Sequence, residues 1–210
     1  MRKIITTTFV TMDGVMQAPG GPDEDKSSGF AYGGWTANYW DDVMGKETMG
    51  RFIEQPFELL LGRRTYDIFA AYWPKYDKPD AENSVIATKF NSVKKYVVSH
   101  KQTKLDWKGS ILVTGDVPAE LRKLKKMDGP DLWVHGSGNL IQTLLREGLI
   151  DRMHIWTFPV TVGPGKRLFA EGSQPLGWKL VDSKTASTGV IIASYEPAGK
   201  LKVGTIGSEE

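Results

Sequence analysis

Residues 132–148 read Leu-Trp-Val-His-Gly-Ser-Gly-Asn-Leu-Ile-Gln-Thr-Leu-Leu-Arg-Glu-Gly. A short apolar run at 132–134 leads into a turn at Gly136-Ser137-Gly138. The apolar residues that follow are spaced as one face of a helix. Gly148 stands where a helix C-cap glycine belongs. The stretch therefore predicts a strand, a glycine turn and a helix.

This turn suits a phosphate. It exposes backbone N–H groups at the positive end of a helix, and a side chain at Gly136 or Gly138 would stand in the way of an anion. The dinucleotide-binding fingerprint also asks for a third glycine, where this chain has Ile141, and for an acidic residue about 20 positions on, which is missing from 154–158. Taken alone, the stretch fits a tight turn without a ligand equally well.

Composition narrows the class of protein. The 210 residues are 40% hydrophobic, enough for one well-packed domain. The net charge of +2 gives no broad basic face, so we expect no nucleic-acid partner and interpret the basic residues of the 118–127 segment as a solvated helix face. There is no cysteine, no secretory signal pattern and no apolar run of about 20 residues. A soluble cytoplasmic protein that does not enter membranes is the expectation. The basic residues of the 118–127 segment are Arg122, Lys123, Lys125 and Lys126.

The order of elements indicates an α/β protein. Strand patterns alternate with helical ones as far as residue 150, and antiparallel strands joined by a Ser-Thr-Gly turn follow. We expect a mixed, mainly parallel sheet with helices on both faces and an antiparallel C-terminal hairpin, forming one domain over 1–198 with a frayed tail at 199–210. Residues 16–35 are expected to form a long, mobile loop or lid. Predicted strands are 2–12, 57–61, 94–98, 110–113, 132–134, 151–162, 178–186 and 190–195; predicted helices are 36–54, 66–72, 118–127 and about 139–147, with a weak short element at 85–89.

Glycines and cationic or hydroxyl side chains follow four of the predicted strands. In open α/β sheets, ligands gather at the carboxyl ends of the strands, so these tips predict one binding edge. A dinucleotide needs several such points, and cations at two of them favour NADP over NAD. The tips are Gly62-Arg63-Arg64-Thr65, Ser99-His100-Lys101, Thr114-Gly115 and Gly136-Ser137-Gly138-Asn139-Leu140.

Seven short motifs occur in order between residues 4 and 196. They are Thr11-Met-Asp-Gly14, Leu60-Leu-Gly-Arg-Arg-Thr-Tyr66, Tyr96-Val-Val-Ser99, Val134-His-Gly-Ser-Gly-Asn139, Phe158-Pro-Val-Thr-Val-Gly163, Gly165-Lys-Arg-Leu-Phe169 and Thr188-Gly-Val-Ile191. With them the chain resembles the dihydrofolate reductase-like family, and most of all its branch related to the reductase domain of bacterial riboflavin biosynthesis.

The resemblance implies hydride transfer from NADPH to a small heteroaromatic substrate, a pterin- or aminopyrimidine-like ring. It places Gly62 to Thr65 at the pyrophosphate and 2′-phosphate, Ser99 to Lys101 at the adenosine ribose-phosphate, and Gly136 to Leu140 at the pyrophosphate. Phe9, Val10 and Met16 would border the nicotinamide, and the lid from Met16 to Trp35 would close over it. The same likeness implies a homodimer.

The sequence leaves more than one carboxyl as a candidate proton donor. Asp13, close to the nicotinamide end by sequence, is one catalytic candidate. The resemblance to folate reductases implies a carboxylate early in the first helix, where Asp41 is the second candidate and Asp42 and Glu47 are further possibilities. A turn aspartate that bonds its own backbone is the competing interpretation of Asp13. The three histidines lack metal-ligand spacing, so no metal is expected. A non-catalytic protein that binds a nucleotide or metabolite is the alternative function.

Overall fold

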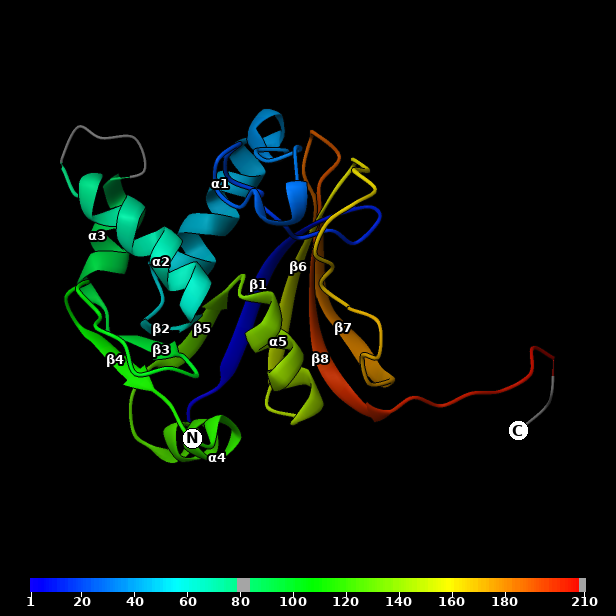
Figure 1. The fold of residues 1–210 in the computed structure, drawn as a ribbon. Coiled ribbons are helices and arrows are strands. Elements are labelled where there is room, and N and C mark those ends of the chain that lie inside the picture. The colour runs from blue at the N-terminus through cyan, green and yellow to red at the C-terminus, as the bar shows by residue number, and fades with distance from the viewer. Residues whose placement is uncertain (79–83, 208–210) are drawn as a thin grey trace.

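The computed structural model describes residues 1–78 and 84–207, and within these ranges the chain folds around an eight-stranded sheet (Figure 1). The strands lie in the order β4-β3-β2-β5-β1-β6-β8-β7. The first six are parallel, while β8 is antiparallel to β6 and β7 is antiparallel to β8. The predicted mixed sheet is confirmed. Its strands are β1 (Ile4–Thr11), β2 (Phe57–Gly62), β3 (Lys95–Val98), β4 (Ser110–Val113), β5 (Asp131–His135), β6 (Arg152–Phe158), β7 (Leu176–Thr185) and β8 (Ile191–Lys200).

Helices cover both faces of the sheet (Figure 1). One apolar cluster packs α4 and α5 against one face, and a second packs α1, α2 and α3 against the other. The alternation of side chains along a strand separates the two clusters, so that in β1 Ile4 and Val10 belong to the first and Ile5 to the second. The helices are α1 (Asp42–Thr48), α2 (Arg63–Tyr72), α3 (Ser84–Ser92), α4 (Val117–Lys126) and α5 (Gly138–Arg146).

Residues 132–148 fold as the predicted strand, glycine turn and helix. Strand β5 ends at His135, and the chain turns through Gly136 and Ser137, both left-handed with φ of 63° and 69°. Helix α5 then presents three leucines and one isoleucine to the core and ends before Gly148, whose φ is 60°. Glycine adopts this conformation without strain, which is why it ends the helix cleanly.

Several element boundaries differ from the predictions. The single helix expected at 36–54 is three pieces: a 3-10 turn (Ala37–Tyr39), α1, and a π-helical turn (Met49–Ile53). The break arises because Asp41 is extended and its side chain caps α1 by accepting the Met44 N–H at 2.9 Å. The weak element at 85–89 is the helix α3, and β6 ends at Phe158 instead of reaching 162. Apolar spacing alone does not locate such caps and turns.

At the end of the chain, β8 continues to Lys200, beyond the expected limit at 198. The residues that follow run away from the sheet (Figure 1), and the last three residues of the expected tail lie outside the described ranges. Among the described helices none has the length and apolar character needed to cross a membrane.

Candidate functional site

The predicted ligand-binding tips lie on one edge of the sheet, because β4, β3, β2, β5 and β1 are parallel neighbours. The tips of β2 and β5 are joined by the Ser137 hydroxyl, which accepts the Gly62 N–H at 2.9 Å and donates to Thr65 Oγ1 at 2.8 Å. A Cβ at Gly62 would lie 3.3 Å from the Cβ and Oγ of Ser137. Glycine at 62 therefore permits the close approach of the two tips.

Two helices begin at these joined tips, and neither has a side-chain cap within the described structure. Helix α2 starts after Gly62 and α5 after Ser137, whose hydroxyl is used between the strands instead of capping its own helix. Helix N-termini carry N–H groups that lack partners within the helix and a partial positive charge. The donor set of this edge therefore fits a phosphate or pyrophosphate.

The first arginine after β2 lies at the rim of this edge. Arg63 Nε donates to both carboxylate oxygens of Asp67, at 2.8 and 2.9 Å, and another of its nitrogens donates to Thr103 in the loop after β3. Its guanidinium lies over the ring of Tyr66, 5.9 Å from the centroid. The arginine is thus held in place by its neighbours while more than a third of its side chain stays exposed.

The tips of β3 and β4 follow next to β2, the strand that leads into Arg63. Ser99 is buried, its N–H donates to Val113 O at 3.1 Å, and its hydroxyl donates to Lys101 O at 2.9 Å. This turn leaves His100 and Lys101 exposed. After β4, Gly115 adopts a φ of 82° and Asp116 caps α4. Because β3 and β4 are parallel, Thr114 and Gly115 lie on the same edge of the sheet as Ser99.

The three residues expected around a nicotinamide do not lie together. Phe9 packs on the α1 face, with its ring 5.2 Å from that of Trp156, whereas Val10 points into the α5 cluster. Adjacent residues of one strand face opposite sides of a sheet, which is why the side chains of Phe9 and Val10 lie in different apolar clusters. Met16 lies at the start of α5, where its sulfur is 3.4 Å from a Cβ placed at Gly138.

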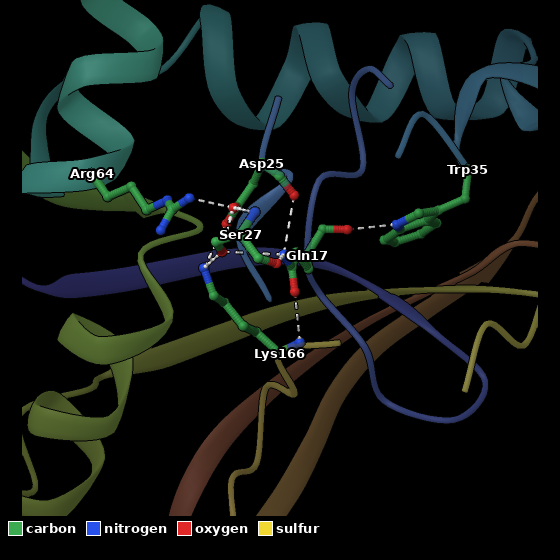
Figure 2. Close-up of polar contacts among 6 residues, drawn as sticks. All are labelled: Gln17, Asp25, Ser27, Trp35, Arg64 and Lys166. Carbon is green, nitrogen blue, oxygen red and sulfur yellow. Dashed lines mark hydrogen bonds and ion pairs between the residues drawn. The ribbon is translucent and has the colours of Figure 1, made fainter. Parts of the chain in front are cut away.

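The lid, defined as residues 16–35, is fixed against the same edge by polar contacts (Figure 2). Gln17 Nε2 donates to the backbone oxygens of Asp25 and Ser27, both at 3.0 Å, and Trp35 Nε1 donates to Gln17 O at 2.8 Å. The Asp25 carboxylate accepts bonds from Arg64 and from Lys166, the latter at 2.6 Å. Sequence reasoning missed Asp25 and Lys166, because 141 positions separate them and no local pattern connects them.

Both predicted catalytic aspartates accept hydrogen bonds from neighbouring loops. Asp13 accepts from the Thr11 hydroxyl at 2.5 Å and the Gly163 N–H at 2.8 Å, and these bonds lower its pKa. Asp41 caps α1 and accepts the Ser187 N–H at 2.6 Å, and the bonds from Met44 and Ser187 lower its pKa as well. A general acid near neutral pH needs a raised pKa, so these contacts favour structural roles for both.

The other carboxyls of this region differ in their surroundings. Asp42 is largely exposed, and the buried Glu47 forms an ion pair with Lys184 of β7. In the lid, burial raises the pKa of Glu24, whose carboxylate accepts the Gly20 N–H at 2.6 Å. Burial thus makes Glu24 easier to protonate than a free glutamate, and its carboxylate bonds within the lid.

A row of polar side chains crosses the α1 face of the sheet and was not foreseen from the sequence. Strand register places His135, Thr7, His154 and Ser194 side by side on β5, β1, β6 and β8. His154 Nδ1 lies 2.8 Å from Ser194 Oγ, and burial lowers the pKa of His135 to about 4. The pairing of non-consecutive strands brings these residues together, which a search for helical or metal spacing does not detect.

The family described as the RibD C-terminal domain matches residues 2–192. A relative from Bacillus subtilis (strain 168), the uncharacterized protein YyaP, is 32% identical over 194 residues, which cover 92% of this chain and 94% of the relative.

Solved structures share the fold. A putative riboflavin biosynthesis protein from Shewanella sp. PV-4 aligns with a TM-score of 0.65 at 21% identity, covering 93% of this chain and 98% of that one. Dihydrofolate reductase from Enterococcus faecalis, complexed with NADP(H) and RAB-propyl, gives 0.57 at 12% identity, covering 93% and 96%. A pyrimidine reductase-like protein from Corynebacterium diphtheriae gives 0.58 at 11%, covering 93% and 92%. The fold is that of dihydrofolate reductase-like proteins, and the chain belongs to the RibD C-terminal domain family.

Proposed function

We propose that this protein is an NADPH-dependent reductase that transfers hydride to a small pterin- or aminopyrimidine-like ring. The observation that carries the proposal is the pair of helix starts at the joined tips of β2 and β5, which have no side-chain caps in the described structure and lie beside Arg63 and Arg64. Family membership and the reductase fold of its neighbours support the same activity.

The chain's own groups would divide the work along the edge. The N–H groups at the starts of α2 and α5 would hold the pyrophosphate, because they supply donors and positive potential there. Arg63, fixed by Asp67 and Thr103, would take the 2′-phosphate, for which a preorganised guanidinium is suited. The turns at Ser99–Lys101 and Thr114–Gly115 would border the adenosine. Bound NADPH would supply the hydride.

The substrate end would lie where the lid meets β1. Here Phe9 forms an aromatic group with Trp40 and Trp156, at ring distances of 5.9 and 5.2 Å. Trp156 is fully buried, so the accessible flat apolar surface here is that of Phe9 and Trp40, which would suit a planar heteroaromatic ring. The lid would exclude water from the reacting atoms. Asp13 and Asp41 would act by positioning the loop at 162–163 and the start of α1.

A non-catalytic binding protein is the second candidate. It is favoured by the lowered pKa of Asp13 and of Asp41, which removes the two predicted acids from proton donation near neutral pH. Turnover separates the two functions, because both require coenzyme binding but only the reductase oxidises NADPH.

We also propose that the protein forms a homodimer through the edge strand β7, where Leu180 and Val181 are exposed. Light scattering of the purified protein tests this.

The test is titration of NADPH by fluorescence for the wild type, Arg63→Ala and Gly138→Val. We expect NADPH binding to weaken strongly in both variants. Arg63→Ala removes the guanidinium that would bind the 2′-phosphate, and Gly138→Val fills the space at the start of α5. Arg122→Ala is the matched control, since Arg122 is a half-exposed arginine paired with Glu147 at the far end of α5. Equal affinities for all four proteins would refute the site.

A panel of pterins, dihydrofolate and aminouracils, followed by NADPH absorbance, then tests turnover. Oxidation of NADPH with one class of ring would support the reductase and name its substrate class. Tight NADPH binding without oxidation by any member of the panel would favour the non-catalytic protein.

A further inference from the structure

The lid and the loop at 163–168 form one unit on one side of the binding edge. The Met16 N–H donates to Lys166 O at 2.8 Å, the Lys166 N–H donates to Gln17 Oε1 at 3.1 Å, and Val15 pairs with Arg167 in an antiparallel bridge. These contacts join the start of the lid to the loop at 163–168 more closely than to the tips of β2 and β5.

Two contacts cross from this unit to the helix starts. Met16 lies over Gly138 at the start of α5, and Asp25 forms an ion pair with Arg64 at the start of α2 (Figure 2). Since the same two helix starts are the proposed pyrophosphate site, the lid reaches them with one apolar and one anionic side chain.

Asp25 is built to remain a carboxylate. Its side chain is only 9% exposed, and it accepts the Ser27 hydroxyl at 2.6 Å and Lys166 Nζ at 2.6 Å in addition to Arg64. Burial alone would raise its pKa, but the bonds from Lys166 and Ser27 outweigh burial and lower the pKa. One anionic group thus engages two cations, as a phosphate group would.

The two cations are not sealed off by this contact. The side chains of Arg64 and Lys166 are 56% and 45% exposed, respectively. If Arg64 turned to an incoming phosphate, Asp25 would keep its bonds to Ser27 and Lys166, so the exchange would leave no buried carboxylate unpaired.

We propose that Asp25 is an internal competitor for the coenzyme phosphate: it holds Arg64 until a phosphate takes the guanidinium over, so the lid lowers coenzyme affinity. This inference rests on the proposed function, because the competing ligand is the pyrophosphate of NADPH. It assigns to the lid a role in setting affinity, in addition to covering the reaction.

The experiment is a double-mutant cycle with NADPH as the probe. Asp25→Asn releases Arg64, and we expect the Kd for NADPH to fall about 1.5-fold to fivefold, the range given by a partly exposed ion pair. Asp23→Asn is the matched control, because Asp23 lies in the same lid, is 81% exposed and pairs with Lys26 inside the lid. Its Kd should equal that of the wild type. In an Arg64→Ala background, Asp25→Asn should give no gain.

Hydrogen exchange without coenzyme is the second readout. Asp25→Asn should speed exchange in residues 16–35, whereas Asp23→Asn should not, and Asp25→Ala serves if the asparagine variant folds poorly. An unchanged or raised Kd in Asp25→Asn, or a gain that persists without Arg64, would overturn the competition while leaving the proposed function intact. Failure of the wild type and every variant to bind NADPH would refute the proposed function and this role with it.

Discussion

Replacing Ser137 with alanine tests whether the joined tips of β2 and β5 hold the binding edge together. The change removes a hydroxyl that accepts the Gly62 N–H at 2.9 Å and donates to Thr65 Oγ1 at 2.8 Å. Each lost bond costs about 1 kcal/mol, and a part-buried N–H left without a partner costs more, so we expect a loss of about 2 kcal/mol. For a chain of this length, that lowers Tm by about 4–8 °C.

Ser137→Gly separates the hydrogen bonds from backbone strain. It removes the same hydroxyl, but the φ of 69° at this position is one that glycine adopts freely. Relief of left-handed strain is worth about 1 kcal/mol, so the glycine variant should lose only about half as much stability as the alanine variant. The order of stability expected is wild type, then glycine, then alanine.

Urea unfolding of the three proteins measures this order. Ser92→Ala is the control, because Ser92 is an exposed serine whose hydroxyl bonds only to Lys89 O, at 2.8 Å, in the described structure. It should change stability by less than about 0.5 kcal/mol. If alignment of the tips is worth about 1 kcal/mol to NADPH, its Kd should rise about fivefold in Ser137→Ala. A Ser137→Ala protein as stable as Ser92→Ala would refute the reasoning.

Three further predictions concern pH and packing. Burial lowers the pKa of Lys95 from 10.5 to about 8, so the unfolded chain binds more protons than the folded one between these pH values. The free energy of unfolding should therefore rise with pH across that window, by up to about 1.4 kcal/mol per pH unit. Lys95→Met should flatten this rise, as measured by urea midpoints. His135, with a pKa lowered to about 4 by burial, should make stability fall as pH drops from 6.5 to 4, and a fall of the same steepness in His135→Gln would contradict this. At Gly165 a Cβ would lie 2.6 Å from Val15 Cγ1 at a φ of 134°, so Gly165→Ala should destabilise by about 2–3 kcal/mol in thermal unfolding, whereas Gly172→Ala, where a Cβ meets nothing within 4 Å, should cost less.

The sequence predicted the parts of the fold that depend on local pattern. Apolar periodicity located β5 and α5, and glycines at 136 and 148 marked the turns on either side of the helix. The motif order predicted the dihydrofolate reductase-like sheet, which the structure and its neighbours confirm. Apolar spacing did not predict that residues 36–54 would form three helical segments instead of one, because the capping side chain of Asp41 decides where α1 begins.

The sequence by itself determined which strands end in glycine turns that lead into helices, because a strand, a glycine and a helical face lie within about 15 consecutive residues. Only the tertiary structure decided which side chains meet at those turns. The Ser137 hydroxyl reaches Gly62 across 75 positions, and Asp25 meets Lys166 across 141. Such partners are chosen by the order of strands in the sheet and the path of the lid, and the pairing of distant segments leaves no periodic trace in the chain.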